Sequence, residues 1–188
     1  MSFSACRDTF RRGIIEGLLA SEGYIEAIGR TAQGIIPVSA IALDIYPWHA
    51  WANLSLRLTS DPMDIRYAIA DWPHFDFVNQ ETCSPIREAA VYAAEVYRNP
   101  PASMERIEIA HLIFLAGAEA LLDESIAETL NRLGIDAPNL GDGIKGHWFE
   151  YLVLDPDGTV RANYCEIVRA NRSTDRLIDT WRPTPPAR

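Results

Sequence analysis

Apolar residues recur every three to four positions near the start of the chain, in residues 4–28. Phe10, Ile14 and Leu18 then fall on one face of a helix, because an α-helix turns once in about 3.6 residues. Residues 34–45 are apolar on both alternating sides and rich in β-branched side chains. A strand that is apolar on both sides is covered on both faces of its sheet, so we expect a central strand here.

Strict alternation of apolar and polar residues begins at residue 51. The apolar side of this second predicted strand is Ala52, Leu54, Leu56 and Leu58, and the opposite side is Trp51, Asn53, Ser55 and Arg57. The short link of residues 47–50 between the two strands is typical of an antiparallel hairpin. A third, short strand is predicted for residues 65–69.

Two helices are predicted in the middle of the chain. Ser84 is a suitable N-cap and Pro85 suits the first helical position, whereas the sequence Asn-Pro-Pro at residues 99–101 ends that helix. Ser103 can cap a second helix, which runs through an apolar stretch to about Leu122.

A short helix and a second hairpin are predicted after these two helices. Ser125 begins a capping-box pattern, and Gly134 fits the position just past the end of the short helix. Residues 147–154 and 159–168 alternate as strands, with the turn sequence Asp-Pro-Asp-Gly at 155–158 between them.

The order of helix, strands, helices and strands predicts an α+β fold. We expect one domain over residues 1–188, with a mostly antiparallel sheet of four to five strands. The N-terminal helix and the central helical segment are expected to pack on this sheet. The end of the chain, residues 171–188, is rich in arginine and proline and is predicted to be loosely ordered.

Composition excludes several classes of partner and location. A formal charge of −9 argues against a nucleic-acid-binding surface, which needs clustered lysine and arginine. The apolar run 107–122 is shorter than the roughly 20 residues that a bilayer demands, so we expect no membrane contact. The three cysteines are odd in number and far apart, and no secretory signal opens the chain, which predicts a cytoplasmic protein. Lys145 is the single lysine, which indicates a GC-rich bacterial genome.

The candidate chemical motifs lack the context that their chemistry requires. The glycine pattern of residues 141–146 resembles a pyrophosphate cradle but is expected to precede a strand, whereas that cradle needs a helix N-terminus. A thiol or hydroxyl nucleophile at Cys83 or Ser84, with His74 as its base, has no spacing that enforces their approach. His111 lies in an apolar helix and is predicted to be a hydrogen-bonded core residue.

A metal site is the remaining chemical possibility. His49, His74 and His147 could gather with Asp71 and Asp76, but nothing in their spacing makes them converge. We therefore predict no metal ligand, no cofactor and no catalytic residue.

Aromatic and histidine residues are concentrated in residues 46–77, which makes this segment the candidate binding region. Such side chains either close the edge of a core or form a recognition surface, and both interpretations stay open. The candidate binding residues are Trp48, His49, Trp51, Arg66, Asp71, Trp72 and His74.

The segment Arg66-Tyr-Ala-Ile-Ala-Asp-Trp72, together with Ala52-Asn53, resembles an uncharacterised family of bacterial domains of unknown function. The resemblance covers about residues 10–97. Domains of this family look like those found beside polymorphic secreted toxins, where small acidic proteins serve as immunity factors. The resemblance implies an immunity-type function and assigns no catalytic residue.

Three hypotheses about function follow. The first is a non-enzymatic, acidic protein-binding domain, an immunity-type factor that neutralises a basic bacterial toxin. The alternative is an enzyme acting on a small metabolite, with a pocket beside residues 46–77 and His49, His74 or Asp71 in an acid–base role. The third is a structural subunit of a larger assembly.

Overall fold

A computed structural model describes residues 2–138, 149–158 and 162–171, and confirms the α+β fold. In these residues, four strands form one mixed sheet in the order β3-β2-β1-β4. The strands are β1 (Val38–Tyr46), β2 (Trp51–Leu58), β3 (His74–Asn79) and β4 (Glu150–Leu152). The α-helices are α1 (Phe3–Ala20), α2 (Glu22–Ala27), α3 (Ser84–Arg98), α4 (Arg106–Leu121), α5 (Glu124–Arg132) and α6 (Tyr164–Asn171).

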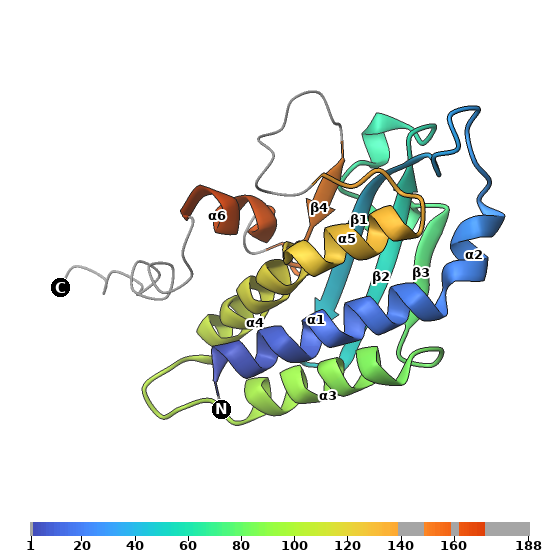
Figure 1. Ribbon diagram of the computed structural model, residues 1–188. Coiled ribbons are helices and arrows are strands. Elements are labelled where there is room, and N and C mark those ends of the chain that lie inside the picture. The colour runs from blue at the N-terminus through green and yellow to red at the C-terminus, as the bar shows by residue number, and fades with distance from the viewer. Residues whose placement is uncertain (1, 139–148, 159–161, 172–188) are drawn as a thin grey trace.

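One face of the sheet packs against a layer of helices, as Figure 1 shows. Helix α1 contacts α3, α4 and α5, and α3 and α4 also contact the strands. The sheet contributes its alternate apolar residues to this interface. They are Ile41, Leu43, Ile45, Leu54, Leu56, Val78 and Tyr151, all buried. The helical layer therefore covers the side of β2 that the sequence pattern predicts to be apolar.

Two small residues allow close approach within this layer. A side chain at Gly17 of α1 would collide with Val78 of β3, and one at Gly117 of α4 would collide with Ile45 of β1. These glycines let the two helices lie directly on the sheet.

The predicted hairpin of β1 and β2 is confirmed. The strands pair antiparallel, with Asp44 opposite Asn53 and Tyr46 opposite Trp51. Strand β1 lies inside the sheet and is buried on both faces, as its two apolar sides predict.

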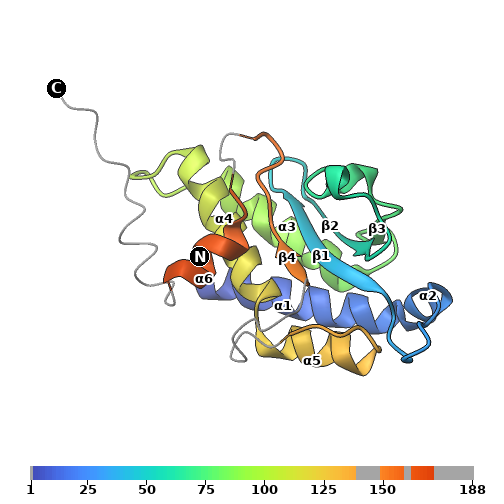
Figure 2. The same ribbon diagram turned by 90° about the horizontal axis from the view of Figure 1, so that it is seen from above.

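The prediction of a third strand at residues 65–69 is wrong. This part of the chain forms two short 3₁₀ helices, η1 (Met63–Ile65) and η2 (Ile69–Asp71), on the face of the sheet away from α1 and α5 (Figure 2). A spacing of four between Ile65 and Ile69 fits one side of a strand and also one side of a helical turn, so the pattern was ambiguous. The third strand is β3, which pairs antiparallel with β2.

The predicted C-terminal hairpin is also wrong. Strand β4 pairs parallel with β1, and α6 follows it where a strand was expected. The turn at residues 155–158 does form. Tyr164 and Cys165 are consecutive and both are buried, which a helix allows. Successive side chains of a strand point to opposite faces of the sheet, so a strand with one covered face would expose one of the two. Residues 147, 148 and 159–161 of the predicted strands lie outside the described residues.

The helix boundaries differ from the predictions by a few residues. Helix α4 is capped by Glu105, which forms a capping box with Glu108, and Ser103 plays no part in it. Helix α5 is capped by Asp123, whose side chain accepts a hydrogen bond from the backbone of Ser125. Gly134 has a positive φ of 86° just past this helix, as predicted.

Candidate functional site

The face of the sheet that points away from the helical layer carries buried polar side chains. Small apolar residues, Ala40 and Ala42, separate two groups of them and lie under Trp72 and Ile69 of the η1–η2 segment. The polar residues of this face are Ser39 and Asp44 of β1, Asn53, Ser55 and Arg57 of β2, and Glu150 of β4.

The first group surrounds a hollow of about 440 Å³ at the end of the sheet where β2 finishes. We call this hollow the arginine pocket, because Arg57, Arg66 and Arg169 all line it. Glu150 and Met63 are further lining residues. The pocket thus draws its residues from β2, the η1–η2 segment, β4 and α6.

The Glu150 carboxylate lies between two guanidinium groups. Nη2 of Arg57 donates to Oε2 of Glu150 over 3.0 Å, and Nε of Arg66 donates to the same oxygen over 2.9 Å. A second hydrogen bond joins Nη2 of Arg66 to the other oxygen of Glu150. This contact raises the pKa of Arg66 above its ordinary value.

The Arg57 side chain is fixed in place from three sides. Its Nε donates to the hydroxyl of Ser39 over 3.1 Å, its guanidinium lies 5.8 Å from the ring centre of Trp72, and only 4% of the residue is exposed. Its Nη1 is nevertheless buried without an acceptor among the described residues. The same holds for Nε of Arg169, whose guanidinium lies over the ring of Tyr151. The arginine pocket therefore has unpaired hydrogen-bond donors.

The second group lies toward the turn between β1 and β2, and we call it the aspartate cluster. It consists of Asp44, Asn53, Ser55 and Asp76. Asp76 adopts a positive φ of 57°, and its backbone N–H donates to the hydroxyl of Ser55 over 3.1 Å. Oδ2 of Asp44, Oδ1 of Asp76 and both polar atoms of the Asn53 side chain are buried without a hydrogen-bond partner among the described residues. This cluster therefore has three unpaired acceptors and one unpaired donor, Nδ2 of Asn53.

Burial determines the protonation of the aspartate cluster. It raises the pKa of Asp44 to about 7, an effect that the Ser55 hydroxyl opposes and the charge of Asp76 reinforces. Burial also raises the pKa of Asp76, against the nearby side chains of Asn53 and Asn79. A protonated Asp44 can donate to the Asn53 carbonyl on the opposite strand, so one proton would give these facing acceptors a hydrogen bond.

The predicted binding residues lie in separate places. Arg66 lies in the arginine pocket, whereas Asp71 is exposed. Trp72 is 3% exposed and donates from its indole nitrogen to the backbone oxygen of Ile65 over 2.9 Å. Trp72 therefore cannot be a surface anchor, and for this residue the core-packing interpretation is correct.

The other predicted residues lie at the β1–β2 turn and on β3. Trp48 and Trp51 are half-buried and His49 is exposed, and Trp48 contacts the ring of Tyr97. Nδ1 of His74 forms a hydrogen bond with the hydroxyl of Tyr24 over 2.9 Å.

The candidate ligands and nucleophiles are likewise dispersed. In the described part of the chain, no three His, Cys, Asp or Glu side chains are placed to hold a metal ion. Cys83 is buried, and burial raises the pKa of its thiol, so it is held as a neutral thiol rather than a nucleophilic thiolate. His111 is buried and contacts the Tyr164 hydroxyl, as a core histidine should. His147 and the glycine pattern at 141–146 lie outside the described residues.

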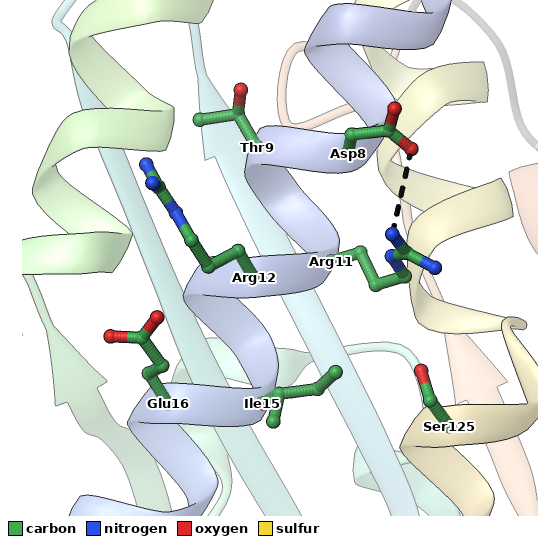
Figure 3. A pocket seen from close by; sticks show the side chains of 7 residues that line it. All are labelled: Asp8, Thr9, Arg11, Arg12, Ile15, Glu16 and Ser125. Atoms are coloured by element: carbon green, nitrogen blue, oxygen red, sulfur yellow. Dashed lines mark ion pairs between the residues drawn. The ribbon is translucent and has the colours of Figure 1, made fainter.

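Another hollow, of about 570 Å³, lies on the outer surface of the helical layer (Figure 3). Its charged residues all come from α1, and three of them, Asp8, Arg11 and Arg12, form ion pairs with one another or with their neighbours. Arg11 lies 3.9 Å from Asp8, and Arg12 donates to Glu88 of α3 over 2.6 Å. Because these charges are compensated and exposed, this groove offers less to a ligand than the arginine pocket does.

Sequence reasoning missed most of both groups. The sequence did hold a signal for the burial of Asn53, Ser55 and Arg57. These polar residues share one side of β2, and the neighbouring strand is predicted to be covered on both faces. No local signal connects these residues with Glu150 or Arg169, which approach them only through the tertiary fold.

Comparison with known proteins adds nothing to this geometry: no family model, no curated protein and no solved structure matches the chain. The resemblance to immunity-type domains therefore stays a prediction. None of the described helices is both long enough and apolar enough to cross a bilayer.

Proposed function

We propose that the protein is a non-enzymatic binding domain that holds a protein partner at the mouth of the arginine pocket. The observation that carries this proposal is the pairing of exposed Met63 and Tyr67 with Arg66. Met63 is 64% exposed and Tyr67 is 53% exposed, and the Arg66 guanidinium lies 4.9 Å from the ring centre of Tyr67. Tyr, Met and Arg are the side chains that protein interfaces favour.

The chemistry of the pocket suits binding better than proton transfer. An arginine keeps its proton throughout the physiological range, so it orients and neutralises anions but does not act as a base. The carboxylate that could act as a base, Glu150, accepts hydrogen bonds from two guanidiniums.

Net charge supports a basic partner. A charge of −9 attracts a cationic protein over distances of about a Debye length and speeds its encounter. With the resemblance of Arg66–Trp72, this leads us to propose an immunity-type role against a small basic bacterial protein. The pocket would then select the partner at short range.

Variants of the two exposed side chains test the proposal. Wild-type protein, Met63→Asp, Tyr67→Ala and the control Val91→Asp, on an exposed site of α3, are used to capture partners from native lysate at low and moderate salt. We expect one partner retained by the wild type and the control, and affinity reduced at least about tenfold by Met63→Asp and by Tyr67→Ala, as titration calorimetry with the purified partner would measure. Equal binding by all four proteins, or no partner at either salt concentration, would contradict the proposal.

A further inference from the structure

We infer that the arginine pocket binds a singly charged carboxylate group, carried by the partner as an acidic side chain or a chain terminus. This inference rests on the proposed function for the molecule that carries the group. The pocket itself supplies the recognition, through unpaired donors, a fitted geometry and a local excess of positive charge.

Two unpaired donors call for an anionic acceptor. Nη1 of Arg57 and Nε of Arg169 belong to residues that line the pocket, and neither has an acceptor among the described residues. A buried donor without a partner is costly, more so when it carries charge. Both atoms are covered by protein, so a ligand oxygen reaches them only when a guanidinium rotates toward the pocket, and that contact would remove the cost.

Glu150 shows that the pocket has the geometry for a carboxylate. Its Oε2 accepts from Nη2 of Arg57 over 3.0 Å and from Nε of Arg66 over 2.9 Å, and its Oε1 accepts from Nη2 of Arg66. Guanidinium groups bind carboxylates in this forked manner, and Arg57 is held by Ser39 before any ligand arrives. Little side-chain entropy is then lost at Arg57 on binding.

Charge balance selects a single negative charge. Among the side chains that line the pocket, three guanidiniums face two carboxylates, Glu150 and Asp61; Glu166, whose charge also acts on Arg66, is exposed and lies outside this lining. One carboxylate neutralises the remaining positive charge, whereas a phosphate dianion would leave an uncompensated negative charge in a partly buried site.

The ligand would first meet Arg66 and Arg169. The Arg66 side chain is 36% exposed, Arg169 is half-buried, and Arg57 lies beneath them. Arg169 is the better residue to change, because Arg66 also holds Glu150.

The test titrates the full-length protein with N-acetylglycinate and with its amide, N-acetylglycinamide, at constant ionic strength. Binding is followed through the arginine Nε–Hε signals in ¹H–¹⁵N NMR spectra. We expect saturable shifts of the Arg57, Arg66 and Arg169 signals with the carboxylate in the millimolar range, and none with the amide. Inorganic phosphate should bind more weakly. Absence of saturation at tens of millimolar carboxylate, or tighter binding of phosphate, would overturn the inference.

Three variants connect the signal with the pocket. Arg169→Gln should weaken carboxylate binding about tenfold, the loss of one charge-assisted hydrogen bond. Glu150→Gln should strengthen binding severalfold, because it removes the carboxylate that competes for Arg57 and Arg66. Arg98→Gln, at an exposed site of α3, should change nothing. If Glu150→Gln folds and binds no better than the wild type, the pocket does not act as inferred.

The inference and the proposed function can fail separately. A partner that depends on Met63 and Tyr67 but binds Arg169→Gln normally, and is not displaced by N-acetylglycinate, would leave the function standing and refute the carboxylate. Carboxylate binding without any protein partner would support the carboxylate site and refute the proposed function.

Discussion

Asp44 and Ile45 are neighbours on β1, and they show how differently the two faces of the sheet are built. Ile45 is fully buried against α4, and an apolar side chain needs only close packing with its neighbours there. Asp44 is almost as buried, yet one of its oxygens has no hydrogen-bond partner among the described residues. The face of the sheet under the helices is closed by apolar packing, whereas the polar face keeps buried atoms that lack a hydrogen-bond partner among the described residues.

What the polar face requires differs between its two ends. The unpaired groups of the aspartate cluster are mainly acceptors, which gain from a proton, whereas those of the arginine pocket are donors, which gain from an anion. Most buried polar groups in proteins have a hydrogen-bond partner. Unpaired groups at both ends of one sheet face therefore indicate function more strongly than exposed charges do. Substitutions on each face, and at an exposed ion pair, test this contrast between the faces.

The largest effect is expected on the helical face. Ile45→Ala removes a fully buried side chain that packs where α4 passes closest to the sheet. We expect the free energy of unfolding to fall by about 2–5 kcal/mol, because a cavity remains. Urea unfolding followed by circular dichroism measures it, with exposed Ile107→Ala as the control that should change it little. A loss below about 1 kcal/mol would mean that this face is not closely packed.

A stabilising substitution is expected one residue away. The pKa of Asp44 is about 7 in the folded protein and near 3.8 when unfolded, so the folded state holds a proton that the unfolded state has released. The free energy of unfolding therefore falls by up to about 4 kcal/mol as pH rises from about 4 to 7, because of this group. Above that range the contribution of Asp44 is constant.

Asp44→Asn removes this dependence, because an amide keeps the shape without ionising. We expect the variant to be more stable than the wild type at pH 8 and the difference between them to shrink toward pH 4. Thermal or urea unfolding across this range measures the difference, in which the contributions of other titrating groups cancel. A wild type that is the more stable protein at pH 8 would show that the cluster holds an ionised Asp44 without difficulty.

An intermediate effect is expected in the arginine pocket. Arg57→Met leaves Ser39 and one side of Glu150 without their donor, which should lower the free energy of unfolding by about 1–3 kcal/mol. Adding Glu150→Leu removes the half-buried acceptor as well and should restore part of the loss. Urea unfolding of the single and double variants tests this, and an additive loss would show that the two residues do not act as a pair.

The sequence predicted the helical face better than the polar face for a physical reason. Alternation along β1 and β2 is a local pattern, so it identified the hairpin and the side of β2 that Leu54 and Leu56 share. Arg57 and Glu150 are 93 residues apart, and their contact exists only because β4 pairs parallel with β1. The error at the C-terminal hairpin has the same origin, since tertiary packing of Tyr164 on α4 overrode an alternating pattern.

The smallest effect is expected at an ion pair on the outside of the helical layer. Arg12 and Glu88 are 2.6 Å apart, closer than Arg57 and Glu150 at 3.0 Å, but more than half of each side chain is exposed. Water competes for both groups and each side chain loses rotamer freedom in pairing, so a short distance alone gives little stability. A double-mutant cycle of Arg12→Ala and Glu88→Ala should give a coupling energy below about 0.5 kcal/mol that decreases further in high salt. A coupling as large as that of Arg57 with Glu150 would contradict the distinction between the two faces, because it would show that burial does not decide what these charges contribute.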